Sequence, residues 1–216
     1  MIYKSYVKTN QSEFIAKVKD VSLRLKIRPQ WLMVVFAAET AYTFSPTVRA
    51  GGKVNGAVGL IQFTEVSCQR IGVSKAQLAN MSNVEQLDWV EKYFVSWGAV
   101  GKMKDLGDVY MVVFAPAMFG RPETTKVYQS PNQSYAQNSG MDKDKKGFIT
   151  VLDIKNFVYK NTPKNQKNNL TLWNTYSETL EKKKLLVQSK PWPVVLIAVI
   201  FVTAFLLIYS KKEKIA

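Results

Sequence analysis

The sequence predicts a mostly α-helical domain with a small irregular or β region, followed by a linker and one C-terminal transmembrane helix. Its 216 residues match one ordinary domain plus an extension. Apolar residues recur at helical spacing over much of residues 10–118. Alternating strand patterns are lacking, except for a short ribbon within 48–58. Near the C-terminus, residues 193–209 form an apolar run without a single charge.

Four helices are expected in order along the chain. Ser12 is a suitable N-cap for the first, whose apolar residues recur every three or four positions from Phe14 onward. Pro29 suits the first turn of the second helix, whose segment WLMVVFAAE is apolar on every side and should be buried. The third helix spans about 83–97, and the almost wholly apolar fourth about 107–118.

The C-terminal part divides into a polar, basic linker with a short juxtamembrane helix (159–190), a transmembrane helix (191–210) and a basic tail (211–216). A helix as long as the apolar run rises about 25 Å, close to the roughly 30 Å hydrocarbon core of a bilayer. Aromatic residues at both ends and flanking lysines suit such a span. A buried core helix is disfavoured because no partner segment accompanies the run. Since the N-terminus lacks an apolar signal segment, we expect a single-pass, tail-anchored protein.

The composition restricts the chemistry. The chain has no histidine and one cysteine, which excludes Ser-His-Asp catalysis, imidazole metal sites and an internal disulfide. A formal net charge of +14 favours polyanionic partners such as nucleic acid, anionic lipid headgroups or an acidic cell-wall polymer. Because the lysines are dispersed and no readout motif is present, we expect no specific nucleic-acid partner.

Glu39 is the most informative polar residue because it ends the apolar run of the second helix. Burial disfavours the charged carboxylate and raises its pKa, as the proton donor in glycosidic bond cleavage requires. The structural alternative is a helix-end glutamate paired with Arg49 or Lys53. A Gly-rich segment, AGGKVNGAVGLIQFT, follows at 50–64. Its glycines permit close backbone approach to a ligand, and the amide of Gln62 suits a sugar groove.

This pattern resembles the soluble lytic transglycosylase (SLT) domain of the lysozyme-like superfamily. Glu39-Thr40 and the octapeptide GAVGLIQF at 56–63 are similar to the ES and GAxGLMQ blocks of that family. Later segments resemble a phage-associated branch, in order: MSNVEQLDWVEKYF (81–94), DVYMVVFAPAMFGRPE (108–123) and SYAQNSGMDKDKKGFIT (134–150). The resemblance covers about residues 10–158 and implies a lysozyme-like fold for a domain at 1–158.

The resemblance implies that Glu39 is the catalytic acid and base. It would protonate the oxygen of the β-1,4 bond between N-acetylmuramic acid and N-acetylglucosamine. It would then accept a proton from the muramoyl C6 hydroxyl as a 1,6-anhydro ring closes. One carboxylate suffices because the N-acetyl group of the substrate can stabilise the cation. A hydrolase more often needs a second carboxylate, for which Glu65, Asp105 and Asp108 are candidates outside any matching motif. Hydrolysis therefore stays open.

The same resemblance implies a substrate-binding role for the Gly-rich segment. Gln62 would line the sugar groove, and backbone groups at Gly59 and Leu60 would hold sugar amides. A loop-closing hydrogen bond is the structural alternative for Gln62. Lys53 stands where the family usually has a serine. It could pair with Glu39 and lower the pKa of that carboxyl, or bind a substrate carboxylate.

The block VFAPA at 113–117 replaces the family's AYNAG. The tyrosine hydroxyl of that block is thereby lost. Tyr110 or Tyr128 would have to supply it as a substrate-binding group. Their structural alternative is a role as core or surface aromatics.

A second motif, DKDKKGFITVLD at 142–153, has the spacing of an EF-hand loop. Glycine stands at position 6, an apolar residue at position 8, and oxygen ligands at positions 1, 3, 9 and 12, namely Asp142, Asp144, Thr150 and Asp153. Lys146 replaces the ligand at position 5, and an aspartate replaces the usual bidentate glutamate at position 12. We favour a metal-free structural loop, with Ca²⁺ as the alternative, and no cofactor is required for the expected chemistry.

The sequence thus predicts a membrane-anchored peptidoglycan lytic transglycosylase whose partners are glycan strands and, through the C-terminal helix, a lipid membrane. The phage-associated branch favours a virion membrane, with wall degradation during phage entry, over the bacterial inner membrane. A hydrolytic lysozyme and a non-catalytic peptidoglycan-binding virion or assembly protein are the alternatives.

Overall fold

The computed structural model describes residues 1–163, and these are mostly helical, which confirms the predicted fold class at that level. Within these residues, no helix is both long and apolar enough to cross a bilayer. The predicted transmembrane segment 191–210, the basic tail 211–216 and nearly all of the linker 159–190 lie outside the described residues.

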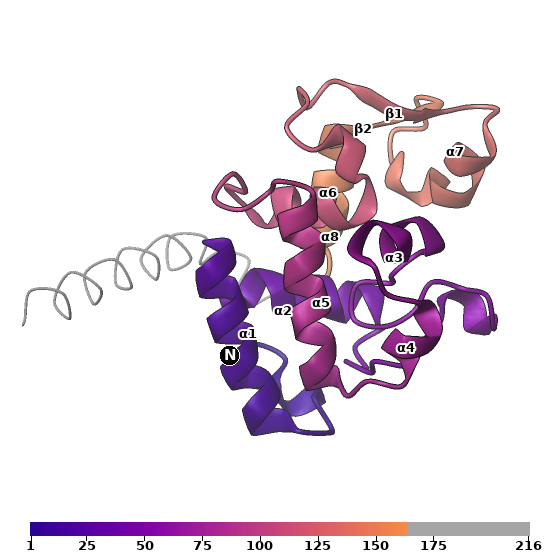
Figure 1. Cartoon of the computed structure of the whole chain (residues 1–216). Coiled ribbons are helices and arrows are strands. Elements are labelled where there is room, and N and C mark those ends of the chain that lie inside the picture. Colours follow the sequence, from indigo (N-terminus) through magenta and orange to yellow (C-terminus); the bar gives the residue numbers. More distant parts are fainter. Residues whose placement is uncertain (164–216) are drawn as a thin grey trace, which may run out of the picture. The chain divides into compact units, whose positions relative to one another are not determined.

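Helices α1 to α6 come first along the chain, followed by strand β1, helix α7, strand β2 and helix α8 (Figure 1). The helices are α1 (Gln11–Leu25), α2 (Pro29–Glu39), α3 (Glu65–Ile71), α4 (Lys75–Ala79), α5 (Asn83–Ser96), α6 (Leu106–Phe114), α7 (Gln133–Asn138) and α8 (Val151–Tyr159). The strands are β1 (Lys126–Gln129) and β2 (Phe148–Thr150), which pair antiparallel.

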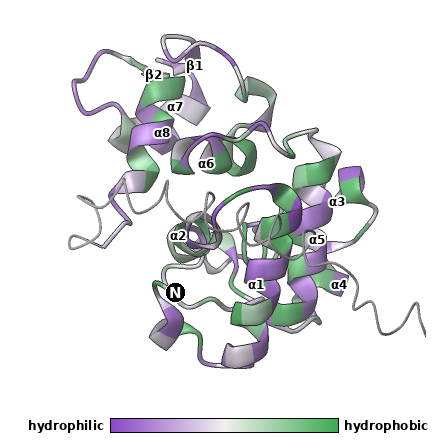
Figure 2. Ribbon diagram, turned by 90° about the vertical axis from the view of Figure 1, so that its left-hand side faces the viewer, coloured by the Kyte–Doolittle hydropathy of each residue, from purple (hydrophilic) through white to green (hydrophobic). Residues whose placement is uncertain are grey.

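Helix α2 lies in the core because it is apolar on every side. All of its residues from Trp31 to Ala37 are buried, as predicted from the sequence. It packs against α1, α6 and α8. Helix α6 is also largely hydrophobic (Figure 2) and makes its most extensive contacts with α8. This packing brings the C-terminal end of α2, where Glu39 stands, close to α6.

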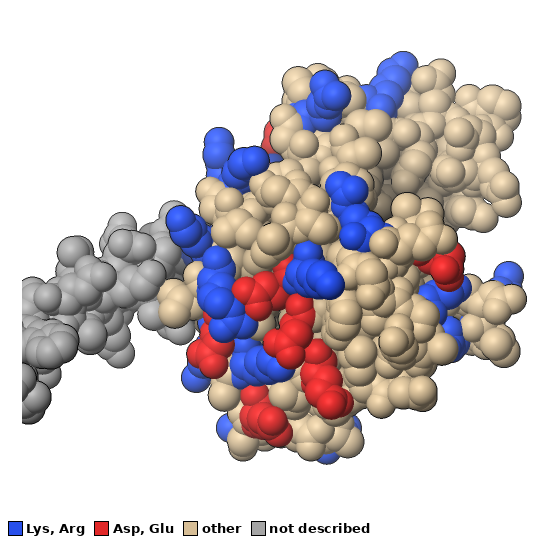
Figure 3. All heavy atoms as spheres, viewed as in Figure 1, with Lys and Arg blue, Asp and Glu red and all other residues tan. Residues whose placement is uncertain are grey.

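Helices α1 and α5 lie side by side and turn charged faces toward solvent, where acidic and basic side chains gather (Figure 3). Two ion pairs join them, Lys17–Asp88 and Arg24–Glu91, each at 2.7 Å. Exposed ion pairs of this kind contribute little stability. The two helices are therefore held together mainly by the buried residues on their facing sides.

The predicted helices form with two corrections at their ends. Helix α1 begins at Gln11, so Ser12 is not its N-cap; the side chain of Gln11 instead bonds to the backbone oxygens of Lys4 and Val7. The fourth predicted helix ends at Phe114 rather than at 118. Proline disfavours helical backbone at the residue before it, and residues Pro116–Met118 form a separate 3₁₀ turn.

Short extended segments complete the fold. The ribbon expected within 48–58 is present as isolated bridges that pair Val58 with Arg49 and with Phe63. The β1–β2 pair was not predicted, because strands of three or four residues offer too few positions for an alternating pattern. The pairing shifts register between Lys126 and Tyr128, which indicates a β-bulge.

A half-buried lysine fastens α8 to the start of α6. The Lys155 ammonium lies 3.1 Å from carboxylate oxygens of both Asp105 and Asp108 and 3.2 Å from Glu123. Burial opposes its charge, but hydrogen bonds to Asp108 and Asp105 raise the pKa of Lys155 above its usual range. Helix α8 is thereby held against the helix that faces Glu39.

Candidate active site

Glu39 is the last residue of α2, and the chain turns sharply just after it. Ala41, Tyr42 and Phe44 all adopt positive φ angles, between 48° and 64°, which residues with a Cβ rarely do. Thr40 holds this turn: its buried hydroxyl donates to the Phe36 carbonyl at 2.6 Å and accepts from the Phe44 N–H at 3.0 Å. Strained backbone of this kind is often found at functional sites.

The carboxyl group of Glu39 is poised to carry a proton near neutral pH. Burial raises the pKa of Glu39 to about 7, and a hydrogen bond from Tyr110 offsets part of the rise. The negative end of the α2 dipole acts in the same direction as burial. Among residues 1–163 no ion pair joins Glu39 to Arg49 or Lys53. The structural alternative of an ion-paired helix end is therefore wrong.

Tyr110, on α6, is the predicted tyrosine that the structure brings to Glu39. Its hydroxyl interacts with the Glu39 carboxyl, and burial and the Glu39 charge both raise the pKa of Tyr110 far above its usual range. Two nearly parallel rings hold it in place, Phe114 at 5.6 Å and Phe157 of α8 at 6.3 Å between centroids. Tyr128 lies on β1 and meets Phe114 edge-on at 6.2 Å, so it belongs to the support of this stack.

Sequence reasoning missed Tyr93, which lines the same region from α5. Its buried hydroxyl donates to the Val112 carbonyl of α6 at 3.0 Å, and its ring meets Phe63 edge-on at 6.2 Å. Burial raises the pKa of Tyr93 to about 12, with a smaller contribution from the charge of Glu39. Tyr93 thus connects the Gly-rich segment to the Glu39 site. Its place on the apolar face of a helix made it indistinguishable from an ordinary core residue.

The Gly-rich segment closes on itself through hydrogen bonds. The side-chain amide of Gln62 donates to the carbonyls of Gly59 at 2.9 Å and Val48 at 3.3 Å, so its loop-closing alternative is present. The Gly59 N–H donates to Val48, and the Leu60 N–H donates to the buried side chain of Gln86. These two N–H donors are already engaged inside the fold, and the role of backbone groups here in holding sugar amides stays a prediction.

Gln86 explains this loop conformation. It is fully buried, and its amide nitrogen donates to the carbonyls of Pro46 and Leu78, each at 2.7 Å. Every polar group of the side chain is therefore used, and one residue of α5 holds two loop segments and helix α4 together. No sequence signal other than its place within a helical pattern marked Gln86.

Lys53 and the alternative carboxylates lie in other surroundings. Lys53 is exposed in its loop and is not paired with Glu39, so the expectation that it lowers the pKa of that carboxyl is wrong. Asp105 and Asp108 surround Lys155, and Glu65 lies 3.5 Å from Lys75. Within the described part of the chain, Glu39 therefore stands without a second predicted carboxylate beside it.

A cavity of about 690 Å³ lies beside the end of α5 and helix α6. Trp97, whose ring meets Tyr93 at 6.4 Å, and Met111, which follows Tyr110 in α6, form one side of it. Lys155 and its three carboxylate partners, Asp105, Asp108 and Glu123, form another side. Neither Glu39 nor Tyr110 is among the lining residues, so the cavity is separate from the Glu39 carboxyl.

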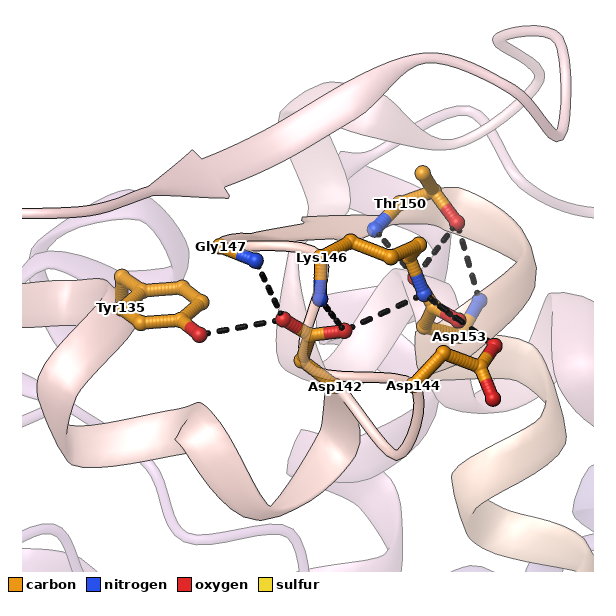
Figure 4. A network of polar contacts seen from close by, with 7 residues as sticks. All are labelled: Tyr135, Asp142, Asp144, Lys146, Gly147, Thr150 and Asp153. Atoms are coloured by element: carbon orange, nitrogen blue, oxygen red, sulfur yellow. Dashed lines mark hydrogen bonds and ion pairs between the residues drawn. The ribbon is translucent and has the colours of Figure 1, made fainter.

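The predicted metal residues lie in one loop, together with an ammonium group (Figure 4). The Lys146 ammonium stands among the carboxylates of Asp142, Asp144 and Asp153. The Thr150 hydroxyl donates to Asp153 and accepts from its N–H, as the N-cap of α8. Over residues 1–163, no group of three or more acidic, cysteine or histidine side chains is arranged to hold a metal.

Comparisons of the chain with protein-family models, with curated proteins and with solved structures found no match. Function is therefore argued from the site itself.

Proposed function

We propose that this protein is a membrane-anchored peptidoglycan lytic transglycosylase with Glu39 as its single acid and base. The observation that carries the proposal is a carboxyl group with a pKa of about 7 at the end of a buried helix, hydrogen-bonded to a tyrosine and free of any ion pair in residues 1–163. Structural glutamates usually keep low pKa values, because exposure or a cation stabilises their charge. A carboxyl that is half protonated at neutral pH suits general acid catalysis.

The proposed reaction uses the same carboxyl twice. Protonated Glu39 donates its proton to the glycosidic oxygen, the C1–O bond of the muramoyl residue breaks, and the substrate's N-acetyl group stabilises the cation. Glu39, now ionised, accepts the proton of the C6 hydroxyl as that oxygen bonds to C1. The Tyr110 hydroxyl stabilises the ionised stage, because it donates to the carboxylate. Glu39 ends the cycle protonated, and no water is consumed.

Within residues 1–163, no second predicted carboxylate lies beside Glu39, which favours this lyase over a hydrolytic lysozyme, since a lysozyme more often uses two. Attachment to a membrane through 191–210, and a place in a phage virion that opens the wall during entry, belong to the same proposal. They rest on the sequence outside the described residues and on the resemblance to the phage-associated branch.

The test incubates the full-length chain in detergent micelles with purified peptidoglycan and analyses the released muropeptides by mass spectrometry. Glu39→Gln is the test variant, since it keeps the shape of the side chain but cannot transfer the proton. Glu65→Gln is the matched control, because it changes an exposed glutamate in the same way.

We expect products lighter by one water than hydrolytic ones from the native chain and from Glu65→Gln, and none from Glu39→Gln. Hydrated products that depend on Glu39 would instead define a lysozyme. Wall binding without any soluble product would favour the non-catalytic peptidoglycan-binding protein.

A further inference from the structure

The loop 142–153 gathers three carboxylates around one ammonium group. The Nζ atom of Lys146 lies 3.2 Å from Asp142, 3.2 Å from Asp153 and 3.7 Å from Asp144 (Figure 4). These aspartates occupy positions 1, 12 and 3 of an EF-hand spacing, whose oxygens converge on Ca²⁺ in metal-binding loops. Lys146 comes from position 5, which normally supplies another oxygen.

Asp142 is the buried centre of this arrangement. One carboxylate oxygen accepts from the Lys146 N–H at 3.0 Å, and the other from the Gly147 N–H at 2.8 Å and the Tyr135 hydroxyl at 3.0 Å. The Asp142 side chain is fully buried, and a buried carboxylate needs a cation beside it.

Asp153 connects the same ammonium to helix α8. One of its oxygens accepts from the N–H of Thr150 at 2.8 Å and from its hydroxyl at 2.7 Å, which completes the capping box of α8. The other oxygen contacts Lys146. The ammonium therefore joins the start of the loop to the start of the helix that follows it, as a bound metal would.

We propose that the Lys146 ammonium takes the place of the calcium ion in this loop, and that its removal exposes a latent Ca²⁺ site. Three aspartates and three lysines make residues 142–153 neutral without a metal. The loop then folds in the absence of calcium and still anchors α8. Since Phe157 of α8 stacks on Tyr110, the support of the Glu39 site is independent of calcium as well.

The experiment measures thermal unfolding of the full-length chain in detergent, in EDTA and in CaCl₂ at matched ionic strength. Lys146→Gln removes the ammonium. Lys143→Gln is the control, because it removes the same charge from an exposed lysine in the same loop whose ammonium is not the one paired with the three aspartates. Terbium luminescence, sensitised by Tyr135 next to Asp142, reports metal binding independently of stability.

We expect the unfolding midpoints of the native chain and of Lys143→Gln to be the same in EDTA and in calcium. The midpoint of Lys146→Gln should fall by about 3–8 °C in EDTA and recover in calcium, because the three carboxylates then lack the cation between them and accept the ion. Only this variant should give terbium luminescence.

Calcium stabilisation of the native chain would overturn the proposal. So would a Lys146→Gln variant that is unaffected by EDTA and calcium alike. If that variant does not fold in EDTA, folding on addition of calcium supports the proposal, and failure to fold in calcium contradicts it.

Discussion

Placing Glu39 at the end of a buried helix costs stability whenever its carboxyl group is charged. Its pKa is about 7 in the folded chain, against an ordinary value of 4.5. The folded state therefore binds more protons than the unfolded state between these two pH values. The cost is absent below about pH 4.5, grows as the pH rises, and is complete above about pH 7, where it reaches about 3 kcal/mol.

We expect Glu39→Gln to be more stable than the native chain at pH 8 by about 1–3 kcal/mol, and nearly equal to it at pH 4.5. Glutamine resembles the protonated acid and carries no charge to bury. Urea unfolding at the two pH values measures the difference. Glu65→Gln, at an exposed position, should show no such pH-dependent gain, and equal gains in both variants would contradict the explanation.

Tyr110 sets the upper pH limit of the proposed activity. Its hydrogen bond lowers the pKa of Glu39, so the loss of its hydroxyl raises that pKa further. We expect Tyr110→Phe to move the alkaline limb of the lytic pH profile to higher pH, while the aromatic stack remains. Tyr128→Phe is the control and should leave the limb in place. If Tyr110→Phe leaves the pH profile unchanged, the Tyr110 hydroxyl does not set the pKa of the catalytic acid, and the explanation is wrong.

Among the structural elements, the Gly-rich loop needs glycine for different reasons at Gly59 and at Gly52. Gly59 has φ +80°, and a Cβ there would lie 2.3 Å from the buried Gln86 side chain. Gly52 also has positive φ, at +67°, but a Cβ there would meet nothing within 4 Å. Alanine substitutions at Gly59 and Gly52 therefore distinguish steric conflict with Gln86 from backbone strain alone.

We expect Gly59→Ala to lower the free energy of unfolding by roughly 2–4 kcal/mol, and Gly52→Ala by about 1 kcal/mol. Strain affects both variants, but only the first displaces Gln86 from its three hydrogen bonds. Denaturant unfolding measures both values. Similar losses in the two variants would mean that Gln86 does not constrain the loop.

The long helices could be predicted from sequence, and the shorter elements could not. A helix such as α5 shows its apolar repeat over several turns, whereas α4 has five residues and depends on the capping box of Ser74. Glu39 was recognisable because a charged residue ends an apolar run. The sequence left Tyr110 and Tyr128 as alternatives for the tyrosine of the site. The packing of α2 against α6, which the sequence does not reveal, brings Tyr110 to Glu39.

For the whole molecule, two lysines perform a task that composition alone does not reveal. The net charge of +14 suggests lysines dispersed in solvent. Yet Lys146 and Lys155 each stand among three carboxylates. Lys146 holds the start of α8 to the preceding loop, and Lys155, within α8, holds the helix to the start of α6. Positive charge thus has a structural role inside the domain, besides the attraction to polyanions that its excess favours.

Two features of the chain favour attachment to a membrane: the excess positive charge and the apolar segment 191–210. Their contributions differ in their dependence on salt. Lysines bind anionic lipid through a field that salt screens within about 10 Å or less. Insertion of an apolar segment does not depend on salt. A charged residue in the middle of such a segment costs about 2.5–3.5 kcal/mol on insertion scales.

We expect the full chain to float with neutral phosphatidylcholine vesicles in a density gradient, in low salt and in 1 M NaCl alike (a screening length of about 3 Å). The double variant Val199→Arg and Thr203→Arg should stay at the bottom of the gradient, because two buried charges oppose insertion. The triple variant Lys182→Gln, Lys183→Gln and Lys184→Gln should still float, since the apolar segment is intact. Flotation that requires anionic lipid and disappears in salt would instead assign attachment to the lysines, and the predicted membrane anchor would be wrong.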